Sequence, residues 1–194
     1  MRTAFVAATL ISTVATTAHA DMARYELDID HTNVYFTVEH IGYVRTLGIF
    51  TDLSGAFSYD VDSQELGEVA VTIDAGSVNT FNAARDGHVR NRDFLHVSDH
   101  PEITFVATGG TPSGDKTGTV TGDLTILGVT QPVTLDVTLN KVAPYPFGHK
   151  REVLGLSMST TIQRSDFGMT YGVDNGLVGD EVRINIETEA MKME

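Results

Sequence analysis

Cysteine is absent from this chain of 194 residues, and positively charged residues are few. Without cysteine the protein has no disulfide framework, no thiolate nucleophile and no thiol to carry a lipid anchor. The 13 Lys and Arg residues are outnumbered by 26 Asp and Glu residues, which gives a formal net charge of −13. Because nucleic acids and anionic membranes are recognised through basic patches, we expect neither to be a direct partner.

The N-terminus carries the features of an export signal. Arg2 precedes an uncharged, largely apolar run from Ala4 to Ile11, and the segment Ala18–Ala20 has the small-x-small pattern that signal peptidase accepts. The apolar run is much shorter than the roughly 20 residues that span a bilayer. We therefore predict a cleaved signal peptide at residues 1–20 and a single exported domain at residues 21–194.

The remaining sequence reads as a series of strands. Apolar residues alternate with small polar ones in the two-residue period of half-buried strands, as in the segment from Val34 to Val38. The segment from Leu124 to Val133 has two β-branched runs around a glycine, which predicts a hairpin. About eight strands are predicted, within the segments 25–29, 34–38, 55–61, 69–73, 103–105, 120–126, 133–139, 154–162 and 182–188.

An all-β chain of this size folds as a two-sheet sandwich or as a closed up-and-down barrel. Alternation alone does not separate the two. Threonine and serine are frequent opposite the apolar face, and 18 glycines supply the kinks that closure needs, so the barrel is favoured. One short helix is predicted near residues 82–90, with Thr80 as its N-cap. Residues 108–118 and 142–150 are predicted to be loops.

A dense polar cluster interrupts this pattern between Val78 and Phe105. Within nine residues, 85–93, it contains three arginines, two aspartates and one histidine. The segments on either side have the composition of scaffold. We therefore expect function to be concentrated in this cluster, whose charged members are Arg85, Asp86, His88, Arg90, Arg92 and Asp93.

The order of motifs along the chain resembles the YceI-like family. The resemblance covers nearly the whole sequence after residue 20, and the motifs occur in the family's order at similar spacing. They are Asp30-His31-Thr32, Val38-Glu39-His40, Gly48-Ile49-Phe50, Arg85-Asp86-x-His88-Val89-Arg90, Asp93-Phe94, Pro101-x-Ile103-Thr104-Phe105, the Gly122–Val133 hairpin and Arg164-Ser165-Asp166-Phe167-Gly168-Met169.

This resemblance implies a lipocalin-like antiparallel barrel in the bacterial periplasm that encloses a long isoprenoid lipid, either a polyprenyl phosphate or an isoprenoid quinone. It implies no enzyme activity and no cofactor. A barrel of eight strands is just wide enough for one slender ligand, although small barrels are often filled by side chains alone. The residues expected to contact the lipid tail are Phe36, Val38, Phe57, Ile73, Phe105, Leu124, Leu135 and Phe167.

The lipid head group is expected to meet polar residues of the two charged motifs. Arginine's planar guanidinium suits phosphate oxygens, whereas a quinone would ask only for hydrogen-bond donors. An equally weighted alternative is that Arg85 with Asp86, and Arg164 with Asp166, form structural ion pairs that fix loops. The candidate head-group residues are Arg85, Asp86, His88, Arg90, Arg92, Arg164, Ser165 and Asp166.

Metal binding and catalysis are the competing interpretations. His88, His96 and His100 with Asp99 form the densest histidine group, but their spacing matches no recognised zinc motif, and Pro101 disfavours a helix through His100. A hydrolase could use Asp86, His88 and Asp166, yet the sequence marks no nucleophile for it. We therefore predict no metal ion and no catalytic residue. Partly apolar edge strands would permit a homodimer, and a quinone ligand would imply a transient membrane partner.

Overall fold

The structure is a computed structural model, and it describes residues 22–194. The predicted signal peptide lies outside the described residues. Twelve antiparallel strands occur in the described part, and most are longer than the sequence pattern predicted. They are β1 (Ala23–Leu27), β2 (Asn33–His40), β3 (Val44–Phe50), β4 (Leu53–Tyr59), β5 (Leu66–Asp74), β6 (Val78–Asn79), β7 (Glu102–Ala107), β8 (Thr111–Pro112), β9 (Thr117–Ile126), β10 (Val129–Pro144), β11 (Glu152–Gln163) and β12 (Val178–Lys192).

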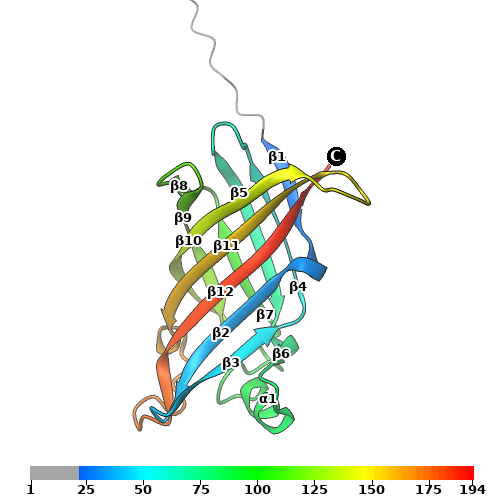
Figure 1. Cartoon of the computed structure of the whole chain (residues 1–194). Helices are drawn as coiled ribbons and strands as arrows, with labels where there is room; N and C mark the ends of the chain where they lie inside the picture. Colours follow the sequence, from blue (N-terminus) through cyan, green and yellow to red (C-terminus); the bar gives the residue numbers. More distant parts are fainter. Residues whose placement is uncertain (1–21) are drawn as a thin grey trace, which may run out of the picture.

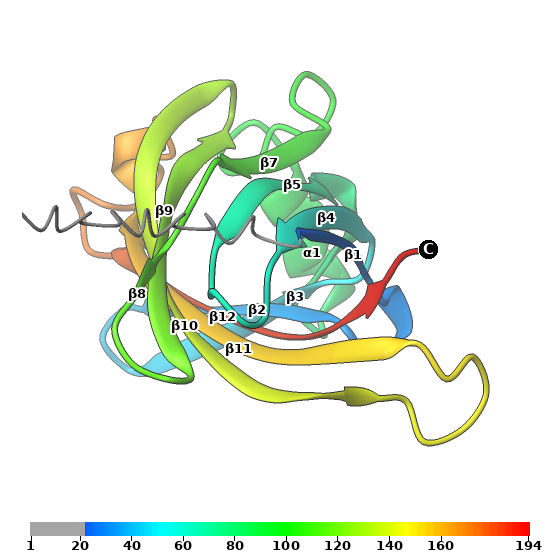
Figure 2. The ribbon, with the colours of Figure 1, turned by 90° about the horizontal axis from the view of Figure 1, so that it is seen from above.

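Eight of these strands close into a barrel, which confirms the predicted fold class. The hydrogen-bonded order is β1-β4-β5-β7-β9-β10-β11-β12, and β12 pairs with β1 to complete the circle. Figure 1 shows the tilted strands from the side, and Figure 2 looks along the barrel from the end at which the described chain begins and ends. Closure leaves the inward face of each strand available to line an interior.

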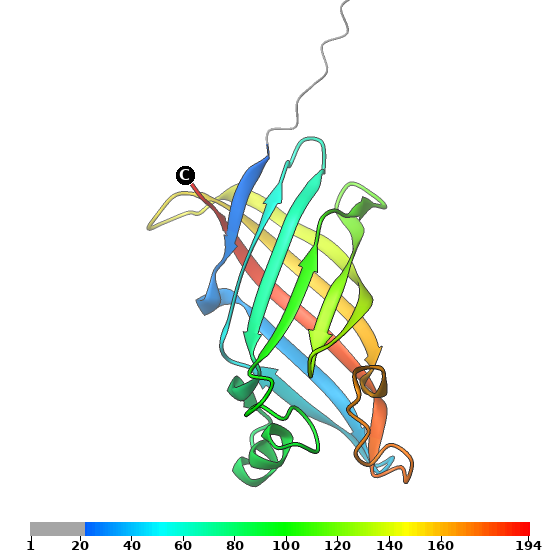
Figure 3. The same ribbon diagram turned by 180° about the vertical axis from the view of Figure 1, so that it is seen from behind.

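The strand β12 is shared between two neighbours. Its C-terminal end pairs with β1, whereas its N-terminal part pairs with β2. From β2 the sheet continues through β3 to the short strand β6, beside the helix α1 (Ala83–Arg90). Figure 1 shows α1 and β6 at the lower end of the barrel, and Figure 3 shows α1 there from behind, opposite the start of β1 and the C-terminus. The charged segment of the sequence therefore lies at one end of the barrel rather than in its wall.

The helix α1 begins close to the predicted position, but its predicted N-cap was wrong. Asn82 caps the helix, since its side-chain oxygen accepts a hydrogen bond from the Arg85 backbone N–H at 3.0 Å. Thr80 stands two residues before this position, and its hydroxyl donates to the Asp86 carboxylate at 2.5 Å and accepts from Arg85 Nε at 2.8 Å. Both residue types cap helices well, and the start of α1 at Ala83 makes Asn82 the capping residue.

The predicted hairpin is present, and both predicted loops contain strand residues. β9 and β10 pair from Ile126 opposite Val129, across a turn in which Leu127 and Gly128 have φ angles of 54° and 72°. Residues 108–118 include β8 and the start of β9, and β10 continues to Pro144. A register shift between Leu139 and Lys141 interrupts the two-residue alternation there, which is why the pattern did not reveal the rest of this strand.

The strand β3 was not predicted. Val44 and Leu47 are both exposed, so its apolar residues do not follow a simple alternation.

Inside the barrel the buried side chains form two clusters. One, around Phe167 and Val78, lies toward the lower end, and the other, around Tyr25 and Leu154, lies toward the upper end. Residues of both clusters line the candidate site, which is the interior of the barrel.

Candidate functional site

A cavity of about 340 Å³ occupies the barrel interior. This volume falls in the range of roughly 300–1,000 Å³ that is usual for small-molecule sites. Its wall is mostly Val, Leu, Ile and Phe contributed by the inward faces of the strands. All eight residues predicted to contact a lipid tail line it, namely Phe36, Val38, Phe57, Ile73, Phe105, Leu124, Leu135 and Phe167. That they touch a ligand stays a prediction.

The two ends of the cavity differ. At the upper end the wall includes exposed residues of the loop between β8 and β9, among them Asp115 and Lys116. At the lower end it includes the buried residues Leu95, Arg164 and Phe167. The cavity is therefore an apolar channel with a solvent-exposed upper rim and a lower end closed by packed side chains.

Arg164 is the charged residue at the closed end. Its side chain lies in η3 (Arg164–Phe167) and the residue is only 3% exposed. Four hydrogen bonds of 2.7–2.8 Å run from the guanidinium to backbone carbonyls, which belong to Met169, Tyr171, Val178 and Gly179. Burial lowers the pKa of Arg164, and the nearby Asp180 carboxylate opposes this change. Arginine nevertheless stays charged at neutral pH.

Among the described residues no carboxylate lies within 4.0 Å of this guanidinium, so the predicted ion pair with Asp166 does not form. Asp166 is exposed, and its carbonyl accepts a hydrogen bond from Gln131. The ring of Phe94 lies beneath the Arg164 guanidinium, 5.7 Å from centroid to Cζ. A cation that is neutralised by carbonyl dipoles and an aromatic face therefore borders the apolar channel.

Ser165 is held by a residue that the sequence analysis missed. Its backbone N–H and its hydroxyl both donate to the Asp180 carboxylate, at 2.9 and 2.7 Å. These bonds join η3 to the start of β12. Asp180 carried no signal in the sequence, because it stands 15 residues away in a segment without a charged motif.

Asp86 and Arg85 are both bonded to Thr80. The Asp86 carboxylate accepts from the Thr80 N–H at 2.7 Å and from its hydroxyl. These bonds lower the pKa of Asp86, with smaller help from Arg90 and Arg85. Arg85 donates to the Thr80 hydroxyl at 2.8 Å and to its carbonyl at 2.6 Å. The predicted Arg85–Asp86 ion pair is thus absent from the described structure, because each of the two side chains is hydrogen-bonded to Thr80 instead.

Arg90 also binds backbone. It donates to the carbonyls of Gly76, at 2.7 Å, and Val78. His88 lies 3.0 Å from the Asp93 carboxylate and packs edge-on against Phe94 and Tyr171. Arg92 is exposed. Of the eight predicted head-group residues in the described chain, Arg164 alone lines the cavity, and the others anchor the loops that close it or face solvent.

Two threonines in the cavity wall were not predicted. The hydroxyls of Thr32 and Thr188 lie 2.6 Å apart, and both residues are buried. They come from β12 and from the residue just before β2, and they add a polar spot to a wall that is mostly apolar. Thr32 stood inside a quoted motif, but only the tertiary structure pairs it with Thr188.

Comparison with known proteins agrees with this geometry. Residues 25–190 match the model of the YceI-like domain. The chain belongs to the YceI-like family. Protein YceI of Salmonella arizonae is 37% identical over 186 residues, which is 95% of each chain. The family member described here therefore matches its relatives along nearly their full length.

Solved structures share the barrel. The crystal structure of Burkholderia cenocepacia BcnA superposes with a TM-score of 0.76 at 26% identity, covering 85% of this chain and 99% of that one. A polyisoprenoid-binding domain from Saccharophagus degradans superposes with a TM-score of 0.65 over 87% of this chain and 98% of that one. At 18% identity, the second likeness shows the fold alone.

Proposed function

We propose that this protein binds a long isoprenoid lipid inside its barrel and carries or stores it in the periplasm. The observation that supports this best is the apolar channel, because a side-chain-filled barrel would leave no cavity of this volume. The hydrophobic effect would supply the affinity and needs no covalent chemistry. The mechanism is sequestration of an apolar chain from water.

The binding property of one relative supports the ligand class. The Saccharophagus degradans domain is described as polyisoprenoid binding, and it shares this fold. The periplasmic location rests on the N-terminal export pattern of residues 1–20. No helix in the part of the chain that the structure describes is long and apolar enough to cross a membrane.

The closed end of the channel suggests where an electron-rich head group would lie. Arg164 lines the cavity, and the described residues offer it no carboxylate within 4.0 Å. A phosphate or a quinone carbonyl at this position would face a buried positive charge in a poorly solvated site, where such contacts are strong. We assign the head group to Arg164 rather than to Arg85 or Arg90 because, although all three guanidinium groups donate to backbone carbonyls, Arg164 alone of the three lines the cavity.

The first test is to identify what the exported protein carries. Protein purified without added ligand is denatured and extracted with organic solvent, and the extract is analysed by mass spectrometry. A stoichiometric polyprenyl phosphate or isoprenoid quinone is the expected result. An empty extract, followed by no uptake of either lipid by the folded protein in titration, would overturn the proposal.

A matched pair of variants locates the ligand. Leu135 and Asp136 are neighbours on β10, and the first lines the cavity whereas the second is exposed. Leu135→Trp would fill part of the channel and should weaken lipid binding by about tenfold or more, while Asp136→Trp should leave it unchanged. Equal affinities in the two variants would place the lipid outside the barrel. Circular dichroism verifies that both variants are folded.

A further inference from the structure

The pairing register of β12 is irregular at the point where its neighbour changes from β2 to β1. Leu27 pairs with Ala190, and Asn33 pairs with Glu187. The chain therefore advances six residues from Leu27 to Asn33 while β12 advances only three residues from Glu187 to Ala190. The three extra residues form the 3-10 turn η1 (Ile29–His31). We refer to this place as the seam.

The seam brings two carboxylates together. Asp28 lies beside Glu189, since the Asp28 N–H donates to the Glu189 carbonyl at 2.9 Å in continuation of the β1–β12 ladder. Thr188 lines the cavity, so the side chain of Glu189 emerges on the other face of β12, toward the outside. Like charges side by side on neighbouring strands are destabilising unless something of opposite charge joins them.

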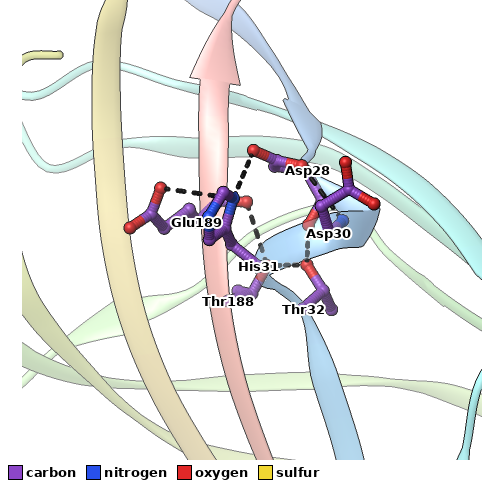
Figure 4. Close-up of polar contacts among 6 residues, drawn as sticks. All are labelled: Asp28, Asp30, His31, Thr32, Thr188 and Glu189. Atoms are coloured by element: carbon purple, nitrogen blue, oxygen red, sulfur yellow. Dashed lines mark hydrogen bonds and ion pairs between the residues drawn. The ribbon is translucent and has the colours of Figure 1, made fainter. Parts of the chain in front are cut away.

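The turn η1 folds His31 back over these carboxylates, as Figure 4 shows. Its Nδ1 lies 2.8 Å from Asp28 Oδ2 and 4.0 Å from Glu189 Oε2. The other oxygen of Asp28 is already engaged, because Oδ1 accepts from the Asp30 N–H at 3.1 Å and caps the turn. That bond fixes the Asp28 carboxylate with Oδ2 directed at His31.

Glu189 has an oxygen without a hydrogen-bond partner. Although its side chain is 35% exposed as a whole, Oε2 is buried and accepts no hydrogen bond, alone among the buried side-chain polar atoms of residues 22–194. It lies 4.0 Å from His31 Nδ1, which is within the reach of an ion pair but beyond hydrogen-bond distance. This atom is the one that faces His31 and Asp28. An anionic oxygen that accepts no hydrogen bond and faces two other ligand-type atoms is placed to ligate a cation.

We propose that Asp28, His31 and Glu189 bind a divalent cation, most suitably Zn²⁺, at the seam. The three donor atoms lie within 4.8 Å of one another. In a tetrahedral zinc site with bonds of about 2.0–2.1 Å, the donors stand roughly 3.4 Å apart. The 2.8 Å contact must open slightly and the 4.0 Å contact must shorten, which needs only small side-chain movements. Water would be the fourth ligand.

The donor set favours zinc over calcium. One imidazole nitrogen with two carboxylate oxygens suits a borderline metal, whereas Ca²⁺ takes six to eight oxygens. The competing interpretation is an ordinary His31–Asp28 ion pair. That pair explains the 2.8 Å contact, and His31 also faces Glu189 Oε2 at 4.0 Å, but at this distance the Glu189 oxygen accepts no hydrogen bond.

A cation here would brace the wall of the cavity. Thr32 follows His31 and Thr188 precedes Glu189, and their bonded hydroxyls line the interior directly behind the proposed site. The metal would therefore tie η1 to β12 at the place where the barrel changes neighbours. This inference stands on the seam alone and does not depend on the identity of the lipid.

The test uses the exported protein without an affinity tag, freed of metal with a chelator and titrated with ZnCl₂, MnCl₂ and CaCl₂ by calorimetry. We expect one Zn²⁺ per chain, tighter than Ca²⁺, together with a higher melting temperature. Glu189→Gln and Asp28→Asn keep the shape of each side chain, and asparagine keeps the cap of η1. Each should weaken Zn²⁺ binding at least about tenfold.

A control variant separates this site from other histidines. His96 forms the comparable pair with Asp99, at 3.5 Å, without a third ligand in the described chain. His96→Gln should leave Zn²⁺ binding unchanged. Absence of stoichiometric Zn²⁺ binding, stronger binding of Ca²⁺, or wild-type affinity in folded Glu189→Gln would each overturn the proposal. X-ray absorption at the zinc edge should show mixed nitrogen and oxygen ligands, and an all-oxygen shell would also contradict it.

Discussion

The ring of Phe36 lies directly over Gly48, its cross-strand partner. A Cβ atom at Gly48 would stand 2.3 Å from Phe36 Cζ, well inside contact distance. Phe36 also lines the cavity and packs against Phe50 with ring centroids 5.6 Å apart. The glycine thus gives a large aromatic side chain a place on the wall of the cavity.

Gly48→Ala should destabilise the protein by roughly 1–3 kcal/mol, because the ring must move against a packed wall. Urea unfolding followed by far-UV circular dichroism measures the change. The control is Gly87→Ala in α1, where a Cβ meets nothing within 4 Å. Alanine there should stabilise by up to about 1 kcal/mol, since glycine is a poor helix former. Wild-type stability of Gly48→Ala would show that the Phe36 ring is free to move.

Arg164→Met should cost roughly 3 kcal/mol or more, because four backbone carbonyls lose their donor in a buried site. Arg164→Lys keeps the charge but not the planar set of donors, so its loss should be smaller. The unfolding midpoints in urea give both values. If the lysine and methionine variants were equally stable, charge and donors would have no part in holding this end of the barrel.

Asp86 should make stability depend on acid pH. Its pKa is lowered in the folded state by the two bonds from Thr80, so the folded protein favours the carboxylate. The contribution is complete above the unfolded value of about 3.9 and is lost as the pH falls through the lower folded value. As the pH is lowered from 6 to 2.5, the urea concentration at the unfolding midpoint should therefore decrease more steeply for the wild type than for Asp86→Asn. Parallel curves would exclude this role.

Tyr25 should make the stability of the protein depend on pH in the alkaline range. It is 1% exposed, stacks on Phe57 and donates to Glu152 at 2.7 Å. Burial and the Glu152 carboxylate raise its pKa above the ordinary range. The neutral phenol is thus favoured in the folded state, and its contribution is complete below about pH 10 and decreases above it. Tyr25→Phe should cost about 1 kcal/mol at neutral pH and reduce the alkaline loss. An unchanged alkaline slope would contradict this assignment.

The wall of the cavity could be predicted in advance because strand geometry is local. In β2 the two-residue period places Val34, Phe36 and Val38 on one face, and all three line the interior. The same reasoning failed at β3 and beyond Leu139, where exposed apolar residues and a bulge break the period. Alternation predicts a face only while the pairing register is regular.

The roles of the charged motifs could not be predicted in this way. Arg85 and Arg90 have the residue type expected for phosphate recognition, but their donors are taken by carbonyls and a hydroxyl of the segment 76–80. A sequence states which donors exist and does not state which acceptors lie nearby. Carbonyl acceptors are present at every residue, so they leave no signal.

The sequence by itself determined that this is an all-β chain whose apolar side chains face one side of each strand, because that follows from the two-residue period of the backbone. It also carried the family motifs. Only the tertiary structure decided that Arg164 borders the cavity, that Thr32 meets Thr188, and that Asp28, His31 and Glu189 converge. These contacts join residues distant in the chain, and they depend on barrel closure and on the register shift at the seam, which no local pattern specifies.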